Sequence, residues 1–163
     1  MVCHPAERGL PTGVRDELGQ LAERVLTAHP LDGGRVQAVF TTDEHMARMN
    51  EQFRGKAMTT DVLSFDYGQP ESTDADDLEN EWTRGEIFIS VDRAAEQARD
   101  RGIAIPCEIA RLLVHGLLHL SGYDHQTAEE LQEMESLTDA FIETSGFSDT
   151  TGFCEDPEFS ETR

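Results

Sequence analysis

Three of the chain's six histidines stand within the segment 115–125, which reads HGLLHLSGYDH. His115 and His119 are four residues apart, so on a helix they lie on one face, one turn apart. Gly122 favours a sharp turn after that helix, and such a turn can bring His125 back toward the first two rings. Three neutral imidazoles that leave one coordination position open are typical of a catalytic rather than a structural metal site. We therefore predict that His115, His119 and His125 bind a metal ion.

Two other interpretations of this segment are weaker. Metzincin proteases share the spacing in their motif HExxHxxGxxH, but Gly116 stands where they carry the glutamate that takes a proton from water. A protease is therefore the weaker alternative. A polar helix face without a metal is disfavoured by the third histidine after the glycine turn. Asp124 is a candidate acceptor that would fix a histidine tautomer, with an ordinary turn-capping aspartate as the alternative.

The charge of the chain is strongly acidic, because 33 acidic residues stand against 13 basic ones and give a net charge of −20. Phosphate affinity comes from basic side chains, so the bulk charge argues against a nucleic-acid ligand. A surplus of carboxylates with Lys56 as the only lysine suits concentrated salt, where the screening length at about 1 M is about 3 Å. We hold high-salt adaptation as a hypothesis. A melting temperature that does not change between dilute buffer and molar KCl would contradict it.

Bulk features point to a single small domain in a reducing compartment. The length of 163 residues favours one domain. The cysteines (Cys3, Cys107 and Cys154) are scattered and odd in number, so we expect thiols rather than a disulfide framework. We find neither a run of roughly 18 apolar residues nor a signal-peptide pattern at the start. The expected location is the cytoplasm, with no membrane partner.

Hydrophobic periodicity and capping signals predict the elements that position the histidines. Helices are predicted over 14–29, 43–50, 91–101 and 106–122 and again from Thr127, and strands over 2–4, 35–41, 62–65 and 85–91. The helix face opposite the histidines should enter the core with Ile109, Leu113, Leu117 and Leu120. These elements form an α+β fold, a mixed sheet packed against helices, over residues 1–145. Residues 66–81 are predicted to be a solvated acidic loop and 146–163 an acidic flexible tail.

With these residues in view, the chain resembles the YbeY family of endoribonucleases. Its histidine segment meets H-G-x-L-H-L-x-G-Y-D-H at every fixed position. Residues 49–68, MNEQFRGKAMTTDVLSFDYG, resemble L-N-x-x-[FY]-R-x-K-x-x-T-[DN]-V-L-S-F-P, and GEIFIS at 85–90 resembles G-[DE]-I-x-I-S. Order and spacing agree from about residue 14 to 145. Two departures are Met49 for the family's leucine and Asp66 for its proline, and the latter adds negative charge near the expected RNA groove.

The resemblance implies one zinc ion per chain on the three histidines and hydrolytic cleavage of single-stranded RNA. It also implies a role in maturing the 3′ end of small-subunit rRNA, with the small ribosomal subunit as partner. The family's arginine falls on Arg54 and its lysine on Lys56. A guanidinium can hold a phosphate by two parallel bonds and steady the charge that builds during attack. We therefore expect Arg54 to clamp the phosphate, with a surface ion pair as the alternative, in an RNA groove lined by Arg48, Arg54, Lys56, Arg84 and Arg111.

The motif leaves the proton acceptor and the metal undecided. Either zinc activates water directly, since it lowers the pKa of bound water to about 7, or the RNA attacks itself through its 2′-hydroxyl and leaves a cyclic phosphate. Three imidazoles also suit nickel, copper or iron. The rival from another class is a non-catalytic ribosome-assembly factor that uses its metal structurally and holds rRNA.

Overall fold

The computed structural model describes residues 2–5, 10, 12–55, 59–69 and 82–147. Within these ranges the chain forms four strands and five helices. The strands are β1 (Val2–Pro5), β2 (Arg35–Thr41), β3 (Val62–Asp66) and β4 (Thr83–Ser90). The helices are α1 (Thr12–Ala28), α2 (Asp43–Arg54), α3 (Val91–Arg101), α4 (Ile105–Leu120) and α5 (Ala128–Glu143).

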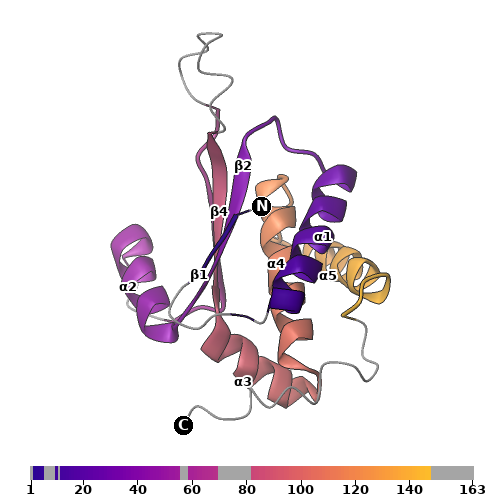
Figure 1. Cartoon of the computed structure of the whole chain (residues 1–163). Coiled ribbons are helices and arrows are strands. Elements are labelled where there is room, and N and C mark those ends of the chain that lie inside the picture. Colours follow the sequence, from indigo (N-terminus) through magenta and orange to yellow (C-terminus); the bar gives the residue numbers. More distant parts are fainter. Residues whose placement is uncertain (1, 6–9, 11, 56–58, 70–81, 148–163) are drawn as a thin grey trace.

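The strands form one mixed sheet in the order β1-β2-β4-β3. β1 and β4 run parallel to β2, whereas β3 pairs with β4 in the antiparallel direction. Figure 1 shows α2 on one face of the sheet and α1, α4 and α5 on the other, with α3 across the end where β4 finishes. The predicted α+β fold, with a mixed sheet packed against helices, is confirmed.

Local capping chemistry explains several of the helix ends. The Thr42 side chain accepts a hydrogen bond from the backbone N–H of His45 and starts α2, and Thr127 starts α5 with a full capping box. Gly102 ends α3 at a φ of 68°, a conformation that glycine adopts at little cost. The prediction for α2 was too short at residue 50, because the helix continues to Gly55, which ends it at a φ of 65°.

The core lies between the sheet and α4, and it contains the apolar face predicted for that helix. Ile109, Leu113 and Leu117 are fully buried, and Leu120 is 5% exposed. The helix period puts Glu108 on the histidine side of α4, where a polar face is expected, but Glu108 is buried there beneath the neighbouring helices α3 and α5. Among the described helices none alone is long and apolar enough to cross a bilayer, although the bent pair α3 and α4 passes that test by length and composition.

The two ends of the chain add to this core to different extents. The short strand predicted near the start is present as β1. At the other end Phe147 is only 1% exposed, and its carbonyl accepts a hydrogen bond from the Cys107 thiol at 2.8 Å. Phe147 therefore packs on the domain, within the segment predicted as a flexible tail from residue 146. The rest of that tail (148–163) and most of the acidic loop (70–81) lie outside the described residues.

Candidate metal centre

The three histidines of the 115–125 segment come together in space. The Nε2 atoms of His115 and His119 lie 3.1 Å apart. One ring nitrogen from each of the three residues falls within 4.8 Å of the others. Tetrahedral zinc at about 2.0–2.1 Å from each nitrogen needs nitrogens roughly 3.3 Å apart, so the first pair already has the required spacing. The exposed ring of His125 leaves the outer side of the cluster accessible.

The backbone after α4 delivers His125 to this cluster. α4 ends at Leu120, and the following N–H groups of Gly122 and Tyr123 donate back to the carbonyls of His119 and Leu118, each at 3.0 Å. Gly122 has a φ of 93°, which side chains with a Cβ rarely adopt. The turn that the sequence predicted from this glycine is therefore present, and it reverses the chain toward the histidine face of α4.

His119 is oriented from behind by a backbone carbonyl. Its Nδ1 lies 2.9 Å from the carbonyl oxygen of Tyr123, so Nδ1–H donates to that oxygen and Nε2 carries the lone pair toward the cluster. Tyr123 is held in turn by His29, which follows α1. The Tyr123 hydroxyl lies 3.2 Å from Nδ1 of His29, and Ser121 Oγ donates to the His29 carbonyl at 3.0 Å.

Asp124 has a role closer to the turn-capping alternative. Its carboxylate accepts hydrogen bonds from the backbone N–H of His125 and from the side-chain amide of Gln126, both at 2.8 Å. These bonds, the Gln126 bond first, lower the pKa of the Asp124 carboxyl. The described contact that fixes a histidine tautomer comes from the Tyr123 carbonyl.

Burial keeps His115 in the form that a metal requires. The pKa of His115 is lowered from 6.5 to about 4, chiefly by desolvation and then by the neighbouring His119 and His125, against an opposing effect from Asp61. His115 is therefore neutral near pH 7 and offers a lone pair without first losing a proton.

Gly116 lets the histidine helix lie directly on the sheet. A Cβ at this position would stand 2.8 Å from Cγ2 of Ile87 and 3.1 Å from Oγ of Ser64. The same Ser64 hydroxyl donates to the Gly116 carbonyl at 3.3 Å. The position at which a metzincin carries its glutamate therefore faces β3 and β4, with no room for a side chain.

A groove beside the cluster contains a buried carboxylate that is paired with arginines. His115, Arg111 and Glu108 line a cavity of about 160 Å³ next to the histidines. Glu108 is only 1% exposed, and its Oε2 lies 3.0 Å from Nη1 of Arg101 and 4.0 Å from Nε of Arg111. Burial raises the pKa of the Glu108 carboxyl, while the two guanidinium groups act in the opposite direction.

The comparison with known proteins places these residues in a family. Residues 10–146 match the family model described as Endoribonuclease YbeY. The chain belongs to the YbeY family. An Endoribonuclease YbeY of Listeria welshimeri is 41% identical over 126 residues, which cover 71% of this chain and 78% of the relative. One from Aquifex aeolicus is 34% identical over 116 residues, covering 71% and 73%.

A solved structure agrees with the fold. The solution structure of TM1509 from Thermotoga maritima matches with a TM-score of 0.55 and 21% identity, over 87% of this chain and 90% of that one. At this identity the likeness establishes the fold alone. The resemblance drawn from the sequence motifs is confirmed by the family match, and with it the enzyme class, a hydrolase that cuts within RNA chains.

The basic residues expected to line the RNA groove of this YbeY protein fall in different places. Arg111 lies one turn before His115 and shares its groove, where its Nη1 contacts Asp139 at 2.5 Å. Arg84 on β4 is paired with Asp66 at 2.8 Å, and its side chain is 15% exposed.

Three further basic positions of the expected groove are on or near α2. Arg48 is exposed on that helix and pairs with Glu44 at 2.8 Å. Arg54 is the last residue of α2, which Figure 1 shows across the sheet from α4. The side chain of Arg54 and the whole of Lys56 lie outside the described residues. The phosphate clamp expected of Arg54 therefore stays a prediction.

Sequence reasoning missed His29, Arg101 and the buried state of Glu108. His29 follows α1 and meets a turn 94 positions later. Arg101 ends α3 and reaches Glu108 from a neighbouring helix. Neither contact has a local signal, because periodicity reports the face of a single helix and not which element covers that face.

Proposed function

We propose that this chain is a zinc-dependent endoribonuclease that cleaves single-stranded RNA and matures the 3′ end of small-subunit rRNA. The observation that carries the proposal is the set of three histidine nitrogens within 4.8 Å of one another, in a chain of the YbeY endoribonuclease family. The small ribosomal subunit is the proposed partner and ribosome quality control a proposed further role. Cytoplasm is the proposed location, since bacterial ribosomes mature there.

The donor set fits a zinc ion. His115 is held neutral by burial, and the Tyr123 carbonyl aims the Nε2 of His119 at the cluster. His115, His119 and His125 would hold the ion and leave its outer side open to substrate. When bound, zinc would polarise a phosphoryl oxygen and lower the pKa of water to about 7.

The remaining work falls to residues around the cluster. We assign the phosphate clamp to Arg54, following the family motif, and an RNA contact to Arg111, which shares the groove with His115. Asp124 would keep its place in the turn by capping the N–H of His125. Residues 1–145 are the proposed catalytic domain, against which Phe147 also packs, and the remaining residues to 163 are a proposed acidic tail.

Cleavage of a single-stranded RNA that carries the 3′ end of small-subunit rRNA tests this function. The wild type, His115→Ala and His45→Ala would be compared in dilute buffer and in molar KCl, with and without a chelator followed by zinc. His45 is a matched control because it lies on α2 and contacts Thr41. We expect cleavage by the wild type and His45→Ala only, and loss of cleavage on chelation.

The outcomes separate the rivals. Equal cleavage by wild type and His115→Ala would identify a contaminating nuclease and reject the enzyme assignment. RNA binding without cleavage under every condition would favour the assembly factor. Among the products, a 2′,3′-cyclic phosphate with a 5′-hydroxyl would show attack by the RNA's own 2′-hydroxyl, and a 3′-hydroxyl with a 5′-phosphate would show attack by water.

A further inference from the structure

We infer that a second cavity, at the N-terminal end of α4, is a subsite for a guanine base of the RNA. The cavity has a volume of about 460 Å³ and lies between the end of α3, α4, α5 and Phe147. This volume is within the range of about 300–1,000 Å³ of small-molecule sites. The assignment rests on the proposed function, because the base would belong to the RNA that is cut at the histidines.

The cavity continues the groove of the metal centre. Arg101 and Arg111 line both spaces, so they form the shared wall between them. Arg111 precedes His115 by one turn of α4, about 6 Å along the helix, and Cys107 precedes it by two turns, about 12 Å. A strand with its scissile phosphate at the histidines therefore has a neighbouring nucleotide within reach of the cavity.

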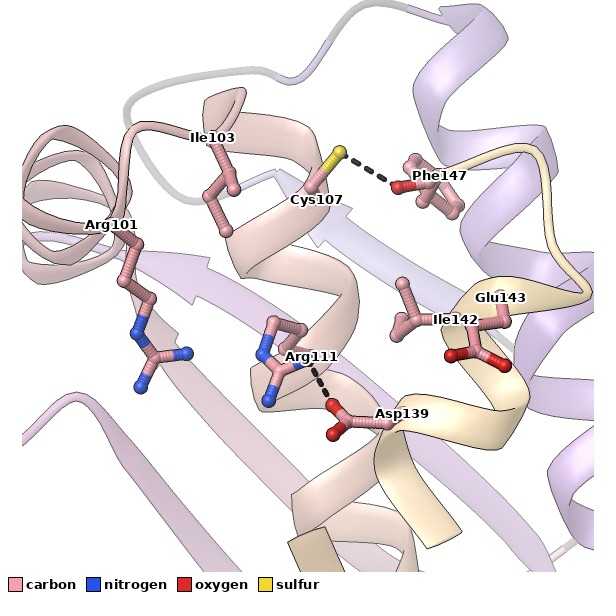
Figure 2. Close-up of a pocket in the computed structure, with 8 residues that line it drawn as sticks. All are labelled: Arg101, Ile103, Cys107, Arg111, Asp139, Ile142, Glu143 and Phe147. Atoms are coloured by element: carbon pink, nitrogen blue, oxygen red, sulfur yellow. Dashed lines mark hydrogen bonds and ion pairs between the residues drawn. The ribbon is translucent and has the colours of Figure 1, made fainter. Parts of the chain in front are cut away.

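The rim of the cavity presents donors and acceptors side by side. Figure 2 shows the guanidinium groups of Arg101 and Arg111 on one side and the carboxylates of Asp139 and Glu143 on α5. The charges of the two arginines and the two carboxylates cancel, and the buried Glu108 adds a further acidic group behind the arginines. A phosphate in this cavity would be repelled by the carboxylates, so we do not expect the cavity to bind an anion. A neutral ligand with both donors and acceptors fits this rim.

Guanine is the base that matches both kinds of group. Its O6 and N7 accept from an arginine, and its N1–H and N2–H₂ groups donate to a carboxylate. Bases of single-stranded RNA expose these edges, because they are not paired. The inner wall of the cavity is formed by Ile103, Ile142 and the thiol-bearing Cys107, an apolar surface for the base plane.

Arg111, the rim arginine nearest the histidines, is already held in place by acidic partners. Its Nη1 contacts Asp139 at 2.5 Å, its Nε lies 4.0 Å from Glu108, and its side chain is only 25% exposed. Glu143 forms no ion pair with a rim arginine in the described part of the chain and is exposed, so its carboxylate is the rim group that can turn toward a ligand. We therefore assign base reading to Glu143 on one side and Arg111 on the other.

A series of substrates tests the subsite through the ratio of kcat/KM values for different bases, rather than through a single cleavage rate. Single-stranded RNAs that differ only in the base next to one cleavage position would be cut by the wild type, Glu143→Gln and the matched control Glu133→Gln. Glu133 is an exposed α5 carboxylate away from the cavity. We expect the wild type and the control to favour guanine in kcat/KM by about tenfold or more. Glu143→Gln should reduce that preference several-fold.

Direct binding keeps the test independent of catalysis. Guanosine monophosphate and adenosine monophosphate would be titrated separately into full-length protein treated with a chelator. Binding would be measured from the NMR chemical shifts of the Ile103 methyl groups. A second variant, Ile103→Phe, would fill the cavity, and its folding would be checked by thermal melting. We expect guanosine monophosphate to shift the Ile103 signals of the wild type more than adenosine monophosphate does, and the filled variant to lose that binding.

The results distinguish the two proposals. Guanine binding at Ile103 in a protein that never cuts RNA would support the subsite and reject the proposed endoribonuclease. Cleavage with no base preference, unchanged in Glu143→Gln, together with no shift at Ile103, would overturn the subsite and leave the endoribonuclease standing.

Discussion

The C-terminal end of α4 carries a histidine pair, whereas its N-terminal end carries Glu108 between two arginines. At the first end the rings are held by neutral partners, a backbone carbonyl from Tyr123 and, behind it, a hydroxyl and an imidazole. At the second end the side chains are held by charge, with Arg101 and Arg111 on one buried carboxylate. Neutral partners leave nitrogen lone pairs free for a metal, while charged partners keep donors and acceptors ready for a polar ligand.

Loss of a histidine ligand should have the largest effect on metal binding at the C-terminal end of α4. We expect His119→Ala to bind no metal and its cleavage rate to fall by more than about 100-fold. Changes to residues that only support a ligand typically reduce metal affinity or activity by about 10–100-fold. Elemental analysis of protein purified without a His-tag and a cleavage assay measure both effects. His45→Ala, outside the cluster, should keep its metal. A His119→Ala protein with a full complement of metal would contradict the predicted ligand set.

Removal of the support behind His119 should have a smaller effect on the same property. Tyr123→Phe deletes the hydroxyl that meets His29, and His29→Phe deletes the partner while keeping a ring against Tyr123. We expect each variant to weaken zinc binding by about tenfold, because the carbonyl that orients His119 becomes less fixed. Competition with a zinc chelator measures the affinity. The double variant should lose little more than either single one, and additive losses would argue against a shared contact.

The two ends should respond to pH with opposite signs, and His115 gives the first. Its pKa is 6.5 in the unfolded chain and about 4 in the folded protein, so the unfolded state binds more protons between these values. In chelated protein the free energy of unfolding should therefore fall as pH decreases from 6.5 toward 4. Urea denaturation of wild type and His115→Gln measures this, because the advantage of the wild type should shrink over that window.

Glu108 should give the smaller, opposite response. Burial raises the pKa of its carboxyl in the folded state, so the folded protein binds more protons than the unfolded chain above the ordinary value of 4.5. The stability contributed by this raised pKa is present below 4.5 and is lost as pH rises through the folded value. Wild type should therefore lose stability relative to Glu108→Gln as pH rises from 4.5. The effect is small because two arginines oppose the burial term.

Sequence patterns predicted what depends on neighbours along the chain. The period of the helix placed His115 and His119 on one face, and capping residues such as Thr127 and Gly102 marked helix ends, because a cap satisfies backbone groups only a few residues away. The order of strands and helices followed from the same local signals. Even the turn at Gly122 was visible, since its conformation is a property of one residue.

The remainder depended on contacts between elements. The sequence placed Glu108 on a polar face, but α3 and α5 cover that face and bury it. The RNA contact of Arg84 stays a prediction, and no local pattern shows that strand pairing brings Asp66 beside this arginine. Nor did the sequence indicate that His29 would meet Tyr123. In each case the deciding partner comes from another element, and no single periodicity reports it.

The glycine at position 116 also bears on how this enzyme could change its chemistry. One substitution, Gly116→Glu, would complete the metzincin pattern as a string of letters. In space, the first carbon of any side chain there would stand 2.8 Å from Ile87, and the glutamate would have to separate α4 from the sheet before it reached a water molecule. The histidine spacing shared with proteases is therefore no short mutational path between the two activities. Protease activity at this site would require α4 and the sheet to pack differently, and we expect a single substitution at position 116 to destabilise the fold instead.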